Sequence, residues 1–264
     1  MNLFLKLEQY RSRVFFLFLV CAVVGYFGKD NFKSSAIPEM VPEVFTEPIQ
    51  MPVVSKDPIR FEKDGFSYTL TPLYNYTISG LVVHRMDYDV WYSLSRTDKT
   101  FTTDVCMLWG DNIKTGAYKN ETLKIDQDFR FCLFNYQSGP PLKNEALSNN
   151  HLIIRDADVK RINNEISPGD QIRITGKLVN VRAVSEGEPG KYEPKTAEWT
   201  TSTTRLDSSG GACEILYVEK IEILKKGNAP YHTLYNIGKD GVLLVILWLF
   251  VQFIRSVILT RRGM

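Results

Sequence analysis

The side chains best suited to acid–base chemistry are three histidines, His84, His151 and His232. They lie far apart without metal-ligand spacing, so the sequence predicts no metal and no cofactor. His151 ends the polar run Ser148-Asn149-Asn150-His151. A catalytic histidine needs a carboxylate or nucleophile beside it, and Asp104 and Glu214 are the candidate carboxylates for a hydrolase. The favoured interpretation is a loop histidine that satisfies nearby backbone groups.

Common catalytic motifs are absent from the sequence. It contains no Gly-x-Ser-x-Gly motif, no phosphate-binding glycine loop and no His-Glu-x-x-His motif. Without residues 1–28 and 241–264, the chain holds 26 basic and 29 acidic residues, a net charge of −3. Such a region is poorly suited to phosphate backbones, so we expect no nucleic-acid partner. We predict no catalytic residues, and a non-enzymatic role is favoured over an enzymatic one.

A 27-residue stretch, 185–211, separates two predicted strands. Loops of this length are uncommon and are often functional. This one carries Tyr192 and Trp199, followed by a polar run that ends at Arg205. The candidate ligand- or partner-binding residues are therefore Trp199, Tyr192, Arg205, His151 and Asn150. The alternative is a mobile insertion whose tryptophan packs on the wall of the fold.

Three cysteines lie outside the first apolar run. Cys106 and Cys132 fall within predicted strands among apolar residues, which favours packing or a structural disulfide over a reactive thiolate. An odd number leaves one cysteine unpaired in an oxidising compartment. We predict one disulfide among Cys106, Cys132 and Cys213, with the Cys106–Cys132 pair favoured by strand placement.

The elements that must position these residues centre on residues 156–224. Asp156 is a suitable N-cap for a helix whose apolar residues recur at helical spacing up to Ile166. Pro168 and Gly169 then form a turn. The alternation that follows, from Ile172 onward, is typical of a half-buried strand.

The predicted strands are 76–83, 89–94, 101–109 and 129–134 before the helix, and 171–184 and 213–224 after it. Strand, strand, strand, helix, strand, strand is the order of an OB-fold. The resemblance covers residues 65–224 and predicts a mainly β fold, a five-stranded OB-like Greek-key barrel with one helix. A two-sheet sandwich is the competing arrangement.

Apolar runs at 14–27 and 241–260 bracket this region. The second has the length of about 20 residues that a bilayer requires, and the first reaches it only with its amphipathic lead-in. Its cleavage as a signal sequence is an open alternative. Basic residues flank the outer ends of the two runs: Lys6, Arg11, Arg13, Arg255, Arg261 and Arg262. The positive-inside rule then places both termini in the cytoplasm and residues 29–240 outside.

The predicted organisation is an N-terminal membrane anchor (1–28), a proline-rich linker (29–64), an exported barrel domain (65–226), a short linker (227–240) and a C-terminal transmembrane helix (241–264). Five prolines in residues 29–64 disfavour helix and favour extended chain. We expect this linker to be a stalk, or a strap laid along a partner.

Several short motifs resemble a family of uncharacterised bacterial envelope proteins: Asp104-x-Cys106-x-x-Trp109-Gly110, Ser148-Asn149-Asn150-His151, Gly169-Asp170-x-Ile172 with Gly176, and Gly211-Ala212-Cys213-Glu214. The resemblance covers roughly the folded part and implies a bacterial, exported setting. We therefore expect an inner-membrane protein anchored at both ends, with a periplasmic or extracellular domain that acts as a non-enzymatic interaction module in an envelope assembly.

Two other functions stay open: a glycan- or peptide-binding module, and a membrane-tethered hydrolase. The expected partners are envelope or membrane proteins and the lipid bilayer. Association with further copies of the chain is also open.

Overall fold

The computed structural model describes residues 3–88, 100–128, 131–185, 195–205 and 213–262. The chain divides into two compact units. The first joins the two ends, residues 1–36 and 228–264, and the second holds residues 37–227.

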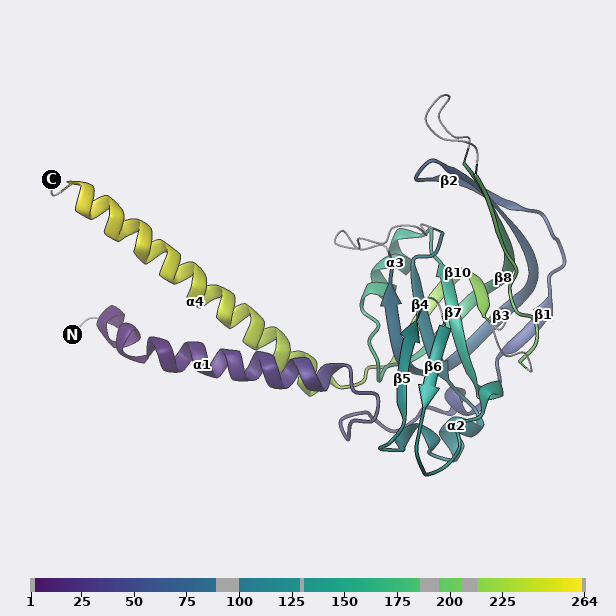
Figure 1. The fold of residues 1–264 in the computed structure, drawn as a ribbon, viewed down its shortest axis with the longest axis horizontal. Helices are drawn as coiled ribbons and strands as arrows, with labels where there is room; N and C mark the ends of the chain where they lie inside the picture. Colours follow the sequence, from purple (N-terminus) through teal and green to yellow (C-terminus); the bar gives the residue numbers. More distant parts are fainter. Residues whose placement is uncertain (1–2, 89–99, 129–130, 186–194, 206–212, 263–264) are drawn as a thin grey trace. The chain divides into compact units, whose positions relative to one another are not determined.

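Five strands of the second unit close into a ring (Figure 1). In ring order they are β3 (Phe66–Asp87), β4 (Thr103–Leu108), β7 (Leu147–Ile153), β10 (Glu214–Lys225) and β8 (Gln171–Ser185), which pairs back with β3. The β7–β10 pairing is parallel and the other four are antiparallel. Strands make up 38% of the chain against 34% helix, so the predicted mainly β character is confirmed.

The interior of the ring is filled by alternate residues of its strands, including Ile78, Val105, Leu152, Ile174 and Leu216, all fully buried. Helix α3 (Ala157–Asn164) adds Val159 to this core. As predicted, Asp156 caps the helix, because its carboxylate accepts hydrogen bonds from the backbone of Asp158 and Val159.

The third strand of the ring is not the one that the sequence predicts. Residues 129–134 overlap β6 (Phe131–Asn135), which pairs with β5 (Lys124–Asp128) in a separate two-stranded hairpin. The ring uses β7 instead, and His151 lies in this strand, not in a loop. The run Asn149-Asn150-His151 is polar and buried on both faces, so it shows none of the apolar alternation by which strands are recognised. The predicted strand 89–94 lies outside the described residues.

Much of the predicted linker 29–64 is folded onto the ring. Strands β1 (Ile49–Pro52) and β2 (Ile59–Lys63) both pair with β3. Before them, the turn η1 (Pro42–Phe45) buries Val44 completely, and the Val44 carbonyl accepts a hydrogen bond from Gly110. Prolines keep this segment extended, and β3 offers it a free edge, so residues 37–64 form a strap on their own barrel.

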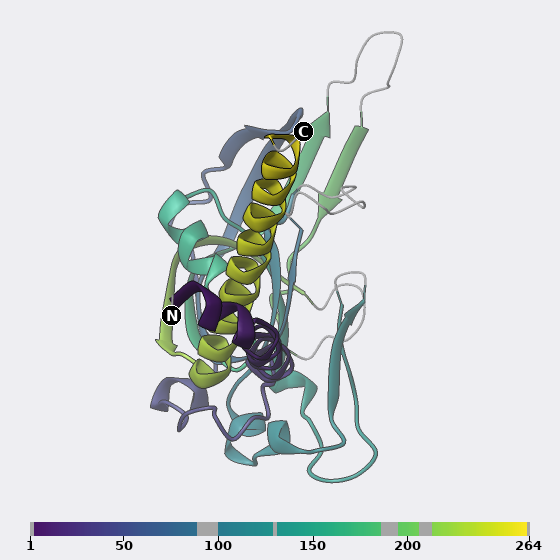
Figure 2. The same ribbon diagram turned by 90° about the vertical axis from the view of Figure 1, so that its left-hand side faces the viewer.

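The predicted loop 185–211 also contains a strand. β9 (Lys195–Trp199) pairs with the far end of β8, and the two run side by side in Figure 2. Trp199 therefore lies at the end of a strand. The remaining short helices are α2 (Asp111–Lys114), η2 (Ala117–Lys119) and η3 (Asn144–Ala146).

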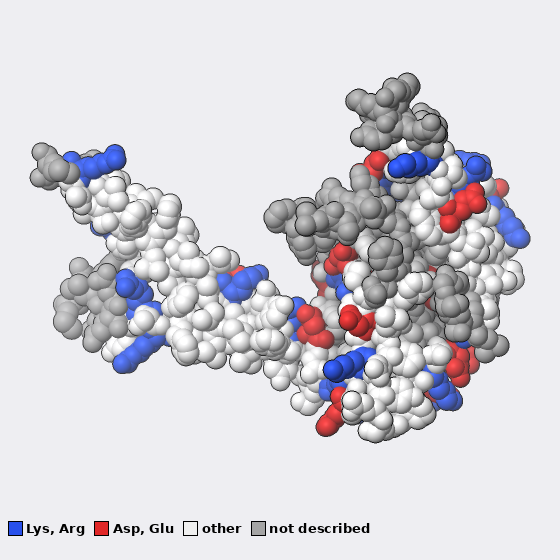
Figure 3. Space-filling model, viewed as in Figure 1, with Lys and Arg blue, Asp and Glu red and all other residues white. Residues whose placement is uncertain are grey.

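The first unit pairs helix α1 (Leu3–Lys29) with helix α4 (Ala229–Arg262). Both helices are long and apolar enough to cross a membrane. In Figure 3 they show mostly uncharged atoms, with basic residues toward the termini. The sequence places the start of the C-terminal helix too late, because the predicted linker 227–240 is helical from Ala229 onward.

Strands β8 and β10 of the ring approach each other closely at Gly176. A Cβ atom there would lie 2.2 Å from the carbonyl oxygen of Tyr217. We predict that Gly176→Ala lowers the free energy of unfolding by about 2 kcal/mol or more, as overpacking does. Chemical denaturation of the full chain in detergent measures this loss. The exposed neighbour substitution Arg182→Ala on the same strand serves as control, and an equal effect of both variants would contradict the close packing.

Candidate functional site: a buried histidine–aspartate pair

His151 and Asp104 form a close pair on the outer face of the ring. Antiparallel register sets them opposite each other on β7 and β4. Nδ1 of His151 lies 2.6 Å from Oδ1 of Asp104, and their side chains are 5% and 0% exposed. Neither atom makes a hydrogen bond of regular geometry among the described residues, so the contact is a close charge pair. Each of the two groups therefore offsets the free-energy cost of burying the other.

The second carboxylate oxygen of Asp104 is also occupied. Oδ2 accepts hydrogen bonds from the Tyr88 hydroxyl (2.7 Å) and from Nε2 of Gln127 (2.9 Å). Gln127 belongs to β5, and its Oε1 lies 3.3 Å from Nδ1 of the more exposed His84. A polar network thus connects the hairpin, β3 and the ring through one carboxylate.

The β5–β6 hairpin is fastened over this pair. Cys106 lies two residues after Asp104 and therefore on the same face of β4. It is at disulfide distance from Cys132 of β6, with a Cα–Cα separation of 6.0 Å. The favoured cysteine pair is thus the one that lies at disulfide distance, and together with Gln127 it holds the hairpin above Asp104.

Phe101 brings two of the candidate residues to one face. Its ring centroid lies 5.1 Å from that of His151 and 5.8 Å from that of Trp199. Trp199 is half-buried against a second apolar cluster on the outside of the ring, which includes Tyr68, Leu70, Val179, Val181 and Ile215. Trp199 packs on the wall of the fold, as the alternative interpretation of residues 185–211 expected.

Asn150 and Arg205 do not join this pair. Because side chains alternate along a strand, Asn150 points to the opposite side of β7 from His151. Its amide donates to the Val105 carbonyl (3.1 Å) and to the Ser148 hydroxyl (2.7 Å). Tyr192 lies outside the described residues.

Arg205 holds the strap instead. It donates a hydrogen bond to the Pro48 carbonyl (2.9 Å), and its charge lies near the buried Tyr76 hydroxyl. Burial raises the pKa of Tyr76 well above its ordinary value, the nearby carboxylate of Glu214 raises it further, and Arg205 opposes both effects. Tyr76 therefore stays a neutral phenol in this setting.

The Asp104–His151 pair has the composition of an acid–base couple but is enclosed. The nearest thiol on the same face, that of Cys106, is in the disulfide, and Asp104 already accepts from Tyr88 and Gln127. No group of three or more His, Cys, Asp or Glu side chains within the described ranges is placed to hold a metal ion. The arrangement is best suited to tying β4, β7 and the hairpin together.

Sequence reasoning missed Tyr88, Gln127 and Phe101, which complete this site. Gln127 offered a weak signal, as a polar residue between the apolar positions of a strand. Their roles depend on contacts between distant segments, which no local pattern encodes.

Comparison of the chain with protein-family models, with curated proteins and with solved structures found no match.

We predict that Asp104→Ala lowers the free energy of unfolding by about 3 kcal/mol, because it removes the buried acceptor of Tyr88 and Gln127 and the carboxylate beside His151. Thermal and denaturant unfolding of the full chain in detergent measures the loss. The matched control is Asp126→Ala, since Asp126 is 87% exposed and lies 3.8 Å from His84. We expect the control to change stability by less than about 0.5 kcal/mol. Equal losses would show that Asp104 contributes no more than a surface carboxylate.

Proposed function

We propose that this chain is a bacterial inner-membrane protein held in the bilayer by α1 and α4. In this proposal residues 37–227 form an exported OB-type barrel, which acts as a non-enzymatic interaction module in an envelope assembly. Both termini lie in the cytoplasm.

The strand order of the ring supports the OB-type assignment. Numbered one to five along the chain, the ring strands are β3, β4, β7, β8 and β10. Around the ring they lie in the order 1-2-3-5-4, and the fourth pairs back with the first. The parallel pairing is between the third and the fifth. Helix α3 lies between the third and fourth strands. This order agrees with that of a five-stranded Greek-key barrel with a helix before its last strand pair, and it therefore supports the proposal.

Two features support export of the barrel. The Cys106–Cys132 pair is placed for a disulfide, and structural disulfides persist in oxidising compartments such as the periplasm. Arginines lie toward the terminal end of each apolar helix, while residues 241–264 contain no acid at all. By the positive-inside rule, that end of each helix faces the cytoplasm.

The observation that carries the non-enzymatic assignment is the enclosure of the Asp104–His151 pair. A general base must reach the proton that it removes, within about 3 Å of the substrate. Other groups already surround this pair. Tyr88 and Gln127, the latter in the hairpin, donate hydrogen bonds to Asp104, and the ring of Phe101 packs near His151. A binding surface requires no such access.

A membrane-tethered hydrolase is the second candidate, since His151 and Asp104 lie 2.6 Å apart, as an acid–base couple requires. The substitution His151→Asn separates the two functions. An interaction module with this variant still recovers its partner if the barrel remains folded, whereas a hydrolase loses its turnover.

We predict that protease added to spheroplasts degrades residues 37–227 and spares epitope tags at both termini. The reason is the placement of arginines at the terminal ends of both apolar helices. Immunoblotting of the two tags measures the outcome, with lysed spheroplasts as the control in which both tags become accessible. A barrel that stays intact until lysis would contradict the proposed orientation.

We predict that the surface beside Trp199 contacts the partner. A photo-crosslinking residue at Lys195, which is exposed and lies on the same face of β9 as Trp199, should capture envelope or membrane proteins. The matched control is the same residue at Lys119, an exposed position on η2. Trp199→Ala should weaken the free energy of partner binding by about 2 kcal/mol, as loss of an aromatic anchor does, and so reduce the partner that is recovered. Unfolding measurements on this variant separate lost binding from lost packing, and equal capture at both positions would contradict the proposed face.

A further inference from the structure

Helices α1 and α4 approach closely over one half of their contact. A Cβ atom on Gly25 would lie 2.3 Å from the backbone nitrogen of Tyr235, and one on Gly238 would lie 2.2 Å from that of Ala22. These distances leave no room for a side chain, so glycine allows the two backbones to touch. The close contact ends at Gly241, where the facing residue is Phe18.

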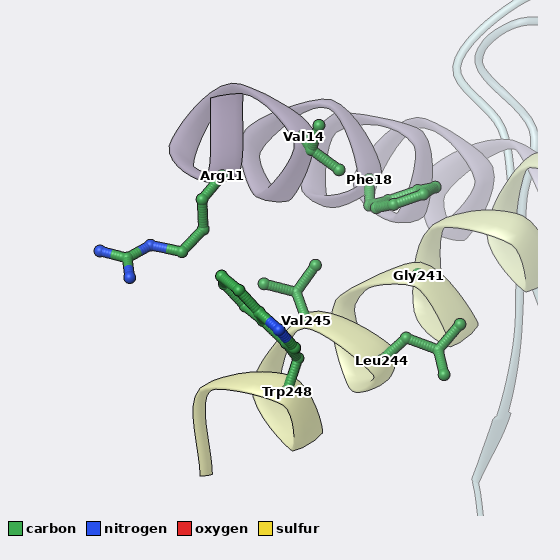
Figure 4. A pocket seen from close by; sticks show the side chains of 7 residues that line it. All are labelled: Arg11, Val14, Phe18, Gly241, Leu244, Val245 and Trp248. Carbon is green, nitrogen blue, oxygen red and sulfur yellow. The ribbon is translucent and has the colours of Figure 1, made fainter. Parts of the chain in front are cut away.

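Beyond Gly241 the two helices separate toward the chain termini (Figure 1). The interface there has no glycine, and bulky side chains replace backbone contact. The gap is a cleft of about 210 Å³ whose lining residues are Arg11, Val14, Phe18, Gly241, Leu244, Val245 and Trp248 (Figure 4).

The walls of this cleft are apolar except at one position. Arg11 lies at the terminal end of the cleft, and its guanidinium carbon is 5.9 Å from the centroid of the Trp248 ring. Arg11 is next to Tyr10, where the apolar span Tyr10–Lys29 begins. For α1 in a bilayer this is the depth of the lipid headgroups, which the arginine side chain can reach.

Basic residues outnumber acidic ones at this end, where Glu8 is the one acidic residue that the sequence places there. The sequence has no acidic residue between Gln9 and Gly28 or after Gly241, while Arg13, Arg255 and Arg261 add to Arg11. A second copy of the chain seated in the cleft would bring the same positive charges into apposition, at a cost in free energy. An anion with an apolar tail complements both the charge and the walls.

We propose that the cleft between α1 and α4 binds the acyl chain of an anionic phospholipid, with the lipid phosphate at Arg11. The acyl chain lies along Val14, Phe18 and Leu244, over about 10 Å of helix between Arg11 and Phe18. This site rests on the proposed insertion of the two helices in a membrane.

Trp248 reports occupancy of the site directly, because brominated acyl chains quench tryptophan fluorescence on contact. The full chain is reconstituted in vesicles that contain dibrominated phosphatidylglycerol or dibrominated phosphatidylcholine at equal mole fractions. The other tryptophans lie within residues 37–227, so a Trp248→Phe variant supplies their contribution. One basic residue near a membrane surface adds about 1 kcal/mol of attraction for anionic lipid, or about a five-fold preference. We therefore expect dibrominated phosphatidylglycerol to occupy the site beside Trp248 with about a five-fold preference over dibrominated phosphatidylcholine, as measured by quenching of Trp248 fluorescence.

Two pairs of variants locate the site. Arg11→Gln should abolish the five-fold preference, whereas Arg13→Gln should keep most of it, because Arg13 lies over the Tyr10 ring and does not line the cleft. Val245→Phe should fill the cleft and reduce quenching by both lipids. Val257→Phe adds the same bulk at an exposed position outside the cleft and should leave the quenching unchanged.

Extraction of membranes with alkaline carbonate tests insertion separately. Equal quenching by the two lipids, or a preference that survives Arg11→Gln, overturns the lipid site and leaves membrane anchoring intact. Absence of quenching in a chain that resists extraction shows that another helix covers Trp248, and this also overturns the site. Release of the chain by carbonate overturns both the site and the proposed anchoring.

Discussion

The long antiparallel pairing of β3 with β8 is the constraint on which the second unit depends. It runs from Ser67 opposite Val184 to Leu81 opposite Gln171, with one register shift between Pro72 and Tyr74. One half of this ladder closes the ring, because β4 joins the end of β3 and β10 joins the start of β8. The other half extends beyond the ring and receives β2 and β9. One pair of strands therefore supports the barrel core and also the outer apolar cluster that holds Phe101 and Trp199.

Strand β7 is the chemically unusual part of this frame. It is buried on both faces yet carries Ser148, Asn149, Asn150 and His151 in succession. Burial of such groups is unfavourable unless each finds a partner, and their partners come from different segments. Asn150 is held by its own ring, whereas His151 needs Asp104, which in turn needs Tyr88 and Gln127. The hairpin is thereby bound to the ring by specific polar contacts in addition to the disulfide, and this favours one defined position of the hairpin on the ring.

In the first unit, small residues lie at one end of the helix pair and large ones at the other. Glycines at positions 25, 238 and 241 allow backbone contact at one end of the helix pair, and Phe18 and Trp248 occupy the other end. A helix pair made only for anchoring has no need of this asymmetry. The arginines gather at the open end, where the lipid headgroups lie in the proposed orientation, so the shape and the charge of the helix pair agree.

Features that depend on local chemistry were determined by the sequence itself. The terminal apolar helices follow from length and composition, the start of α3 follows from the Asp156 cap, and β8 follows from the Pro168-Gly169 turn and the alternation after it. Strand placement also favoured Cys106–Cys132. By contrast, only the tertiary structure decided the identity of β7, the folding of the strap onto β3, the position of Trp199 in β9 and the contact of His151 with Asp104. The physical reason is the same in each case: these features depend on which distant strand lies alongside, and strand register is set by the closure of the whole ring, which short-range periodicity does not encode.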